Sequence, residues 1–191
     1  VSGSTHVRLR DGTSLLVRPI ATSDSDDLAE AFRAWSPDSR YRRFFAGISE
    51  LTSSSLRYLT DVDHHDHEAL VAFDEETGRG VGVVRFIRDR EDPTRAEMAV
   101  SVADDWQGRG VGTTLLSLLA DRAREEDISC FTASVLAANT PMLDVLSELG
   151  EPHVVRRDAG VVELEVPLPE EGIGRQLPAL LRTAATDALE H

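Results

Sequence analysis

Between residues 96 and 115 a strand pattern passes through three alternating glycines directly into a helix pattern. Residues 96–102 are rich in small and β-branched side chains, and from residue 111 onward apolar residues recur at helical spacing. Gly108, Gly110 and Gly112 stand where this helix begins. The first main-chain N–H groups of a helix have no intrahelical partner and lie at the positive end of its dipole, and glycines leave them unshielded by Cβ atoms. Such a turn predicts a site for a phosphate-bearing ligand.

The spacing of these glycines differs from two well-known nucleotide-binding turns. It reads G-x-G-x-G rather than the G-x-G-x-x-G of dinucleotide folds, and no Gly-Lys-Ser/Thr follows, as a nucleoside triphosphate loop requires. The strands ahead of the turn also fit neither fold. They occupy residues 68–74, 81–88 and 95–102 with short polar turns between them, which predicts an antiparallel meander.

The remaining patterns predict helices before and after the meander in the sequence. A helix at 110–126 followed by an apolar strand at 128–136 implies a parallel crossover. The expected fold class is therefore α/β (α+β), with a mixed, mostly antiparallel central sheet flanked by helices. The other predicted elements are a hairpin of Val7–Arg10 and Ser14–Arg18 with a tight turn at Asp11-Gly12, a helix capped by Ser23 that ends near Trp35, helices that begin after Ser36 and at Thr52, a helix at Asn139–Leu149, and a hairpin around Asp158-Ala159-Gly160.

A chain of 191 residues, 41% of them hydrophobic, is large enough for one globular domain without disulfides or a structural metal. We assign residues 1–167 to that domain. Residues 168–191 read as a linker and a C-terminal helix, which packs on its own domain or on another copy to form a homo-oligomer. Leu189–His191 resemble the remnant of an expression tag.

Charge and cysteine content restrict the partners and the compartment. The formal net charge of −14 opposes binding to nucleic acid. No apolar run approaches the roughly 20 residues of a membrane helix, and the first residues lack the pattern of a signal peptide. Cys130 is the single cysteine, so no disulfide can form within the chain, and the expected compartment is a reducing cytoplasm.

The glycine turn resembles a known motif. Gln107-x-x-Gly110-x-Gly112, after a strand and at the start of a helix, resembles the Q/R-x-x-G-x-G/A motif of the GNAT superfamily of acyltransferases. The resemblance covers roughly Val7 to Pro167 and is closer still to the catalytic domain of bacterial protein lysine acetyltransferases of the Pat type. Pat-type enzymes often carry a regulatory domain that binds a small ligand; the 191 residues leave no room for one, so we expect either a single-domain relative or an excised catalytic domain. The segments that carry this likeness are Arg10–Gly12, Val17–Ile20, Ser39–Phe45, Asp63–Ala72, Ala96-Glu97 and Asn139–Leu143.

The resemblance implies a GNAT fold and transfer of acetyl from acetyl-CoA to a lysine side chain of a protein. Acyl-CoA synthetases are typical acceptors of Pat-type enzymes. Read alone, Asn139 is equally well explained as a helix cap. The residues expected to contact acetyl-CoA are Val100 and Val102 through their main chain, the turn residues Gln107, Gly108, Arg109, Gly110, Val111, Gly112 and Thr113, and finally Asn139 and Met142.

Glu97 is the candidate catalytic residue. A lysine ammonium, with a reference pKa of about 10.4, has no lone pair for attack on a thioester, so a base has to remove its proton. Glu97 lies on the strand that leads into the glycine turn, and its position matches the catalytic glutamate of Pat-type enzymes. The alternative is an exposed strand glutamate with no catalytic role. We expect a main-chain N–H near Val100–Val102, freed by a β-bulge, to stabilise the negative charge that develops on the thioester oxygen. The resemblance also implies that this strand splays from its parallel neighbour, Ile128–Leu136, and so makes a cleft for the pantetheine arm.

The chain departs from the family pattern at the leaving group. Many members place a tyrosine seven residues after the asparagine, where it protonates the departing thiolate, and this chain has Leu146 there. Gly150-Glu151 likewise replaces a frequent Gly-Phe. We therefore assign no general acid: a thiolate, with a thiol pKa of about 8.5, leaves unassisted or is protonated through water. Since no nucleophile supports an acyl-enzyme, we expect direct transfer.

Other clusters carry weaker expectations. The histidines and carboxylates of residues 61–68 lie on one short loop without a separate fourth ligand, so we expect no metal there and a loop that is solvated or borders the acceptor site. Cys130 is expected in the core. Arg40, Arg42 and Arg43 are expected to bracket a core edge or meet an acidic partner. Two alternatives to protein acetylation stay open: acetylation of a small amine, such as a polyamine or an antibiotic, and a non-catalytic acyl-CoA sensor.

Overall fold

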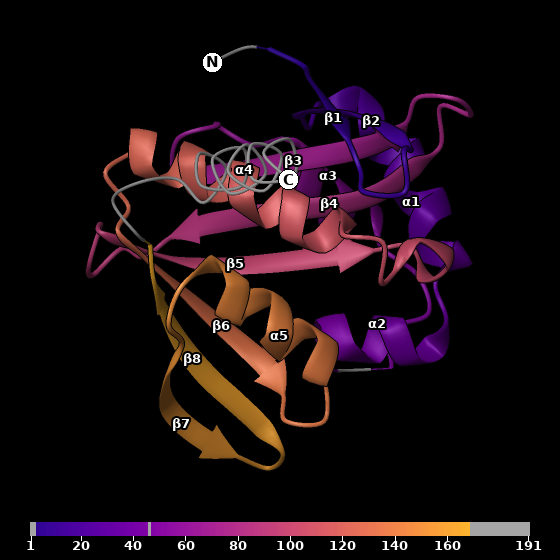
Figure 1. The fold of residues 1–191 in the computed structure, drawn as a ribbon. Helices are drawn as coiled ribbons and strands as arrows, with labels where there is room; N and C mark the ends of the chain where they lie inside the picture. Colours follow the sequence, from indigo (N-terminus) through magenta and orange to yellow (C-terminus); the bar gives the residue numbers. More distant parts are fainter. Residues whose placement is uncertain (1–2, 46, 169–191) are drawn as a thin grey trace, which may run out of the picture.

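The computed structural model describes residues 3–45 and 47–168, which form one mixed sheet with helices on both faces (Figure 1). The strand order is β1-β2-β3-β4-β5-β6-β8-β7, and every neighbouring pair is antiparallel except β5 and β6. The strands are β1 (Thr5–Arg8), β2 (Ser14–Pro19), β3 (His67–Asp74), β4 (Gly80–Arg88), β5 (Arg95–Val102), β6 (Cys130–Leu136), β7 (His153–Asp158) and β8 (Val161–Pro167). The helices are α1 (Ser25–Ala34), α2 (Pro37–Phe44), α3 (Ser53–Thr60), α4 (Val111–Glu125) and α5 (Thr140–Leu149), with short 3-10 turns η1 (Thr22–Asp24) and η2 (Asp104–Trp106).

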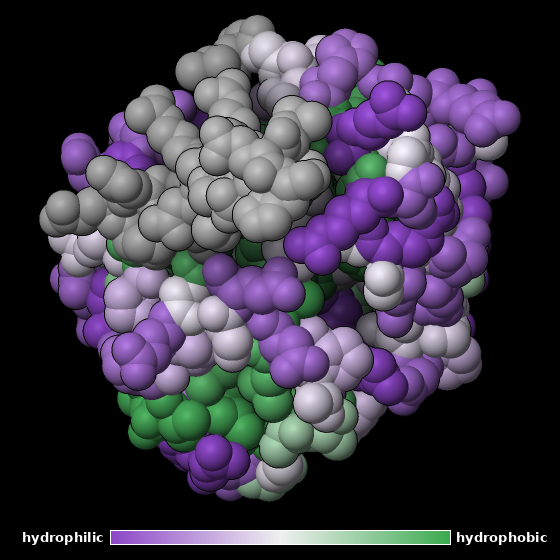
Figure 2. Space-filling view, viewed as in Figure 1, coloured by the Kyte–Doolittle hydropathy of each residue, from purple (hydrophilic) through white to green (hydrophobic). Residues whose placement is uncertain are grey.

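Alternate residues of the strands divide the sheet into two faces. Leu70 and Ala72 of β3 belong to the large core that α4 and α5 cover, whereas Ala69 and Val71 belong to a smaller cluster on the opposite face, where α1, α2 and α3 lie. In the view of Figure 2 the described surface is mostly hydrophilic. Hydrophobic side chains gather in the lower part of this view, over the region of α5 and the β7–β8 hairpin. Among the described residues, no helix is long and apolar enough to cross a membrane.

Local sequence signals fix most element ends. Ser36 and Thr52 cap α2 and α3 by accepting the main-chain N–H of the residue three positions on, at 3.1 Å each, as predicted. The predicted cap at Ser23 is wrong. The Asp24 carboxylate accepts hydrogen bonds from Arg18 and from the N–H of Ala21. These contacts stabilise the 3-10 turn η1 at Thr22–Asp24, and α1 begins after it, at Ser25.

The two hairpins close differently. The last hairpin is confirmed, but Asp158 pairs directly with Val161, so its turn has two residues, Ala159 and Gly160, both with positive φ, rather than the three residues 158–160 that the sequence predicts. The first hairpin is wider than expected. Arg8 pairs with Ser14, and of the two predicted turn residues only Gly12 has a positive φ, because the Asp11 carboxylate accepts the N–H of Thr13 instead.

The sheet opens between its two parallel strands. β5 pairs with β6 only over Arg95–Glu97, but it pairs with β4 without a register shift from Ala96 to Val102 (Figure 1). The predicted bulge at Val100–Val102 is therefore absent. The separation of β6, rather than a bulge, is what leaves the edge of β5 unpaired beyond Glu97.

The end of the described chain closes the core. Leu168 is buried, and its N–H donates to the carbonyl of Ser129 at 2.8 Å. Beyond it, the predicted linker and C-terminal helix lie outside the described residues.

Candidate active site

The turn between η2 and α4 presents a row of free main-chain donors. Gly108 and Gly110 have φ values of +73° and +87°, and Gly110 is the N-cap of α4. The first N–H of this helix with a main-chain partner is that of Thr114, which donates to the carbonyl of Gly110 at 3.0 Å. Within the described residues, the N–H groups of residues 108–113 have no hydrogen-bond partner. Six consecutive free donors at a helix N-terminus suit a diphosphate.

Side chains of the turn brace it from both sides. Gln107 Nε2 donates to the carbonyl of Val102 at 3.2 Å and to Asp104 Oδ1 at 3.1 Å. The Arg109 guanidinium lies 4.0 Å from the Trp106 ring and donates to Asp11 Oδ2 at 2.8 Å. Hydrogen bonds from Thr13, and then from Arg109, lower the pKa of Asp11 to about 2. The Arg109 side chain is thus engaged with the first hairpin, while its main-chain N–H faces the turn.

The main chain of β5 supplies further groups at the opening. Residues of odd number bond to β4, since Ala103 N–H donates to Val81 and the carbonyl of Arg95 accepts from Asp89. The alternation of a strand then directs the N–H and C=O groups of Val100 and Val102 toward β6, where pairing has ended. The two predicted valines therefore lie along the unpaired edge.

Across the opening, α5 brings the other predicted contacts. Asn139 is the N-cap of α5, but its side chain makes no capping hydrogen bond, so the explanation of Asn139 as a helix cap lacks its usual contact. Met142 is half-buried against the core. Leu146 is fully buried, and it can supply no proton. The two tyrosines, Tyr41 and Tyr58, belong to α2 and α3 on the opposite face of the sheet.

Glu97 lies in a cross-sheet row on the face that carries α2 and α3. The row runs from His67 through Ile87 and Glu97 to Thr132 and Glu165, because directly paired residues point to the same face. The Glu97 side chain is exposed. It forms no hydrogen bond or ion pair within the described residues, so its carboxylate is available as a base.

Two arginines lie beside this row, and only one of them was singled out from the sequence. Arg43, from the cluster on α2, is half-buried, and the nearby charge of Glu97 partly offsets the lowering of its pKa by burial. Arg85 of β4 is 5% exposed; burial and the neighbouring Arg43 lower its pKa to about 10. A charged residue in the middle of the apolar strand Gly80–Arg88 was the signal for Arg85.

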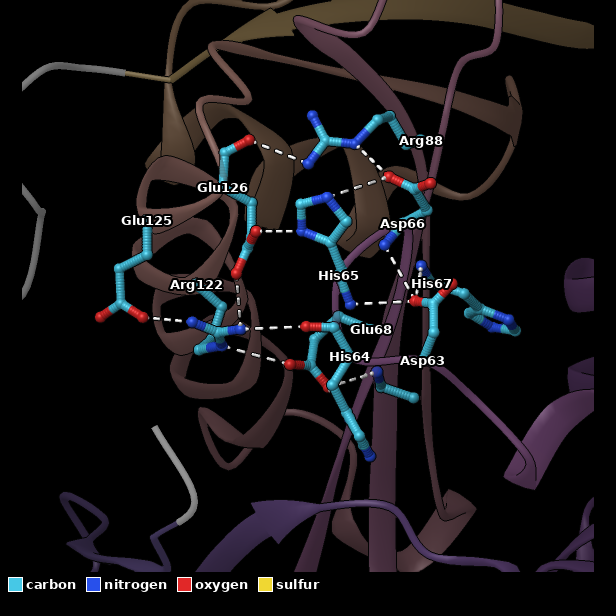
Figure 3. Close-up of polar contacts among 11 residues, drawn as sticks. Asp63, His64, His65, Asp66, His67, Glu68, Arg88, Arg122, Glu125 and Glu126 are labelled. Carbon is cyan, nitrogen blue, oxygen red and sulfur yellow. Dashed lines mark hydrogen bonds and ion pairs between the residues drawn. The ribbon is translucent and has the colours of Figure 1, made fainter.

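The histidine-rich loop is a structural cluster at the far end of α4 (Figure 3). Asp63 Oδ1 accepts three main-chain N–H bonds, which outweigh the effect of burial and lower the pKa of Asp63. Glu68 is 1% exposed and lies between His64 Nδ1, at 2.7 Å, and Arg122 Nε, at 3.1 Å. Among the described residues no group of three or more His, Cys, Asp or Glu is arranged to hold a metal.

His67 of this loop faces the side of Glu97, because it pairs with Ile87, which pairs with Glu97. Its Nε2 accepts from Arg85 at 3.1 Å, and its ring lies 5.2 Å from that of Tyr58. Burial, and then the charge of Arg85, lowers the pKa of His67. Cys130 is half-buried rather than fully in the core, and burial raises the pKa of its thiol, which disfavours the thiolate.

Comparison with known proteins places this geometry among acetyltransferases. Residues 26–150 match the model of the acetyltransferase (GNAT) family. Over 163 residues the chain is 34% identical to "Acetyltransferase Pat" of Mycolicibacterium smegmatis, which covers 85% of this chain and 48% of that protein. It is also 34% identical over 144 residues to "Acetyltransferase PA5475" of Pseudomonas aeruginosa, covering 74% of this chain and 77% of that one.

A solved structure agrees with these sequence relatives. The GNAT domain of S. lividans PAT superposes with a TM-score of 0.80 at 35% identity, over 86% of this chain and 97% of that one. The chain thus spans about half the length of the M. smegmatis relative and nearly all of the S. lividans domain.

Proposed function

The chain belongs to the acetyltransferase (GNAT) family, whose acetyl donor is acetyl-CoA, and from this premise we propose that it transfers acetyl to lysine side chains of proteins. The observation that carries the proposal is the row of free N–H groups at residues 108–113, reached by the same strand that holds Glu97. The resemblance to Pat-type protein lysine acetyltransferases, which the likeness to the M. smegmatis and S. lividans relatives supports, favours a protein acceptor. An acyl-CoA synthetase, in a reducing cytoplasm, is the acceptor that the family resemblance suggests.

The diphosphate of acetyl-CoA would lie on the N–H groups of residues 108–113, with Gln107 and Arg109 holding the turn in shape. Its extended arm would follow the unpaired edge of β5, where Val100 and Val102 offer main-chain groups, and would pass Asn139 and Met142 on the other side. This path leads from the turn back along β5 toward Glu97.

Glu97 then acts as the base. Its carboxylate takes a proton from the lysine ammonium, directly or through a water, and the free amine attacks the thioester carbonyl. A main-chain N–H of Val100 or Val102 would stabilise the oxyanion. Because leucine carries no acidic proton, Leu146 cannot act as an acid, and the thiolate leaves unassisted or is protonated through water.

The matched pair Glu97→Gln and Glu163→Gln tests this assignment. Both glutamates are exposed strand residues on the same face, and only Glu97 lies on β5. We expect Glu97→Gln to lower kcat by about 10²-fold or more with CoA affinity by calorimetry unchanged, and Glu163→Gln to change neither. A Glu97→Gln enzyme with full kcat would remove the base.

Wild-type turnover separates the remaining alternatives. Incubation of a cell lysate with the protein and acetyl-CoA, followed by mass spectrometry, should reveal newly acetylated lysines. Consumption of small amines without modified protein would support the small-amine alternative, and CoA binding without any turnover would support a sensor.

A further inference from the structure

The helix that carries Arg43, α2, packs against β5, the strand of Glu97, so Arg43 and Arg85 together leave a surplus of positive charge beside Glu97. Arg85 and Glu97 are diagonal neighbours on one face, because Arg85 pairs with Ala99 and Ile87 with Glu97. Within the described residues neither arginine forms an ion pair with a carboxylate. His67, which accepts from Arg85, adds no balancing negative charge. Two guanidinium groups therefore share this place with one carboxylate, in a chain whose formal net charge is −14.

The guanidinium of Arg85 still has donors to offer. Its Nη1 bonds to the carbonyl of Leu59 and to His67, and its Nη2 and Nε have no partner within the described residues. Neither nitrogen is fully buried without a partner, so both keep some contact with solvent. Arg85, which is 5% exposed as a residue and retains unpaired N–H groups in contact with solvent, is suited to bind a carboxylate.

The charges around Glu97 indicate that the acceptor substrate itself supplies this carboxylate. Two guanidinium groups repel an incoming lysine ammonium, and once Glu97 has taken the proton of the amine no negative charge remains beside them. An acceptor with a carboxylate near its reactive amine offsets both effects.

We propose that Arg43 and Arg85 form a carboxylate-binding subsite next to Glu97, so that the acceptor presents an amine and a carboxylate together. This proposal rests on the proposed function, in which Glu97 takes a proton from the acceptor amine. The carboxylate is supplied by an acidic side chain beside the target lysine or by a free amino acid; the chemistry is the same.

Matched acceptors test the subsite by activity. We expect kcat/KM to favour L-lysine over cadaverine, which lacks the carboxylate, or the peptide Ac-Ala-Lys-Glu-Ala-amide over its Gln counterpart, by roughly tenfold or more. The first preference identifies a free amino acid as the source, and the second an acidic side chain. Arg43→Gln should bring the favoured ratio close to one, and Arg85→Lys, which keeps the charge but loses the planar fork, should reduce it.

Arg42→Gln is the control on the same helix, since Arg42 is exposed and pairs with Asp38 at 2.6 Å. Calorimetry with Nε-acetyl-L-lysine and N-acetylcadaverine gives a readout that needs no turnover. A carboxylate preference in binding without any acetyl transfer would refute the proposed function and keep the subsite. Equal kcat/KM and equal affinity for both members of every pair would overturn the subsite. A preference for the carboxylate that persists in Arg43→Gln would also overturn it.

Discussion

At the scale of single residues, the three glycines of the turn have different tasks. Gly108 and Gly110 adopt positive φ, which residues with a Cβ reach only with strain. Gly112 has no such φ, and a Cβ there would meet only Val102 Cγ2, at an ordinary 3.7 Å. Two glycines therefore set the path of the chain, whereas the third stands at a position where the motif also allows alanine.

Alanine substitutions should separate these tasks. We expect Gly110→Ala to lower the free energy of unfolding by about 1 kcal/mol or more, because the native φ is strained for alanine. Gly112→Ala should leave stability unchanged or slightly higher and CoA affinity unchanged, since the motif allows alanine at this position and the new Cβ makes only an ordinary contact. Urea unfolding and calorimetry measure stability and CoA affinity. Full stability of Gly110→Ala would contradict the first expectation, and a roughly tenfold loss of CoA affinity in Gly112→Ala the second.

At the scale of elements, α4 rests directly on β4 through Gly82. A Cβ at Gly82 would lie 2.8 Å from Leu115 Cδ1 and 3.2 Å from Val111 Cγ1, so a side chain there would push against the first turns of α4. Because these turns carry the free N–H groups, the seating of the helix also sets their position.

Two glycines of β4 form a matched test of this seating. We expect Gly82→Ala to lower the free energy of unfolding by about 1–3 kcal/mol through overpacking, and to weaken CoA binding as α4 shifts. Gly80→Ala is the control, since its new Cβ would meet Phe73 at 3.8 Å and nothing nearer. If both variants unfold at the same urea concentration as the parent, α4 does not depend on this contact.

Elements with local signals could be predicted from the sequence, and contacts between distant elements could not. The meander and the crossover to β6 follow from alternation and periodicity. The early end of β5–β6 pairing is expected only from the resemblance to the GNAT pattern, because the register of a parallel pair is set by packing on α4 and α5 rather than by the strand residues themselves.

The candidate site divides in the same way. Glu97 and the turn lie within one continuous segment, so their order along the chain fixed their relation in advance. Arg43 comes from α2 and Arg85 from β4, and only the folded sheet brings them beside Glu97. The cap at Ser23 was wrong because the ion pair between Arg18 and Asp24 decided the local structure, and the bulge at Val100–Val102 was wrong because β5 pairs continuously with β4.

At the scale of the whole molecule, one buried carboxylate joins three segments. Glu68 of β3 contacts Arg122 of α4 and His64 of the preceding loop (Figure 3). Arg122 also donates to the carbonyl of His64 and to Glu126 Oε1, both at 3.2 Å. This cluster lies near the last turn of a 15-residue helix, about 20 Å from the turn at its start.

Removing one partner should therefore affect stability and leave ligand binding intact. We expect Arg122→Met to lower the free energy of unfolding by about 3 kcal/mol, because it leaves the Glu68 carboxylate buried without its cation, with CoA affinity unchanged. The double variant Glu68→Leu, Arg122→Met should recover much of that loss. Denaturant titrations of the single and double variants measure both. A single variant as stable as the parent would show that the ion pair contributes nothing.

The separation of β5 from β6 leaves a seam, that is, a row of main-chain N–H and C=O groups without strand partners that lies inside the sheet and not at its outer edge. An outer edge invites strands of other proteins to add on, and such pairing leads to aggregation. This inner edge is walled by a strand on either side, so only a slender, extended molecule with amide groups of its own can enter and complete the ladder. The fold is thereby selective by shape before any side chain takes part, and occupancy of the seam should raise the melting temperature of the protein.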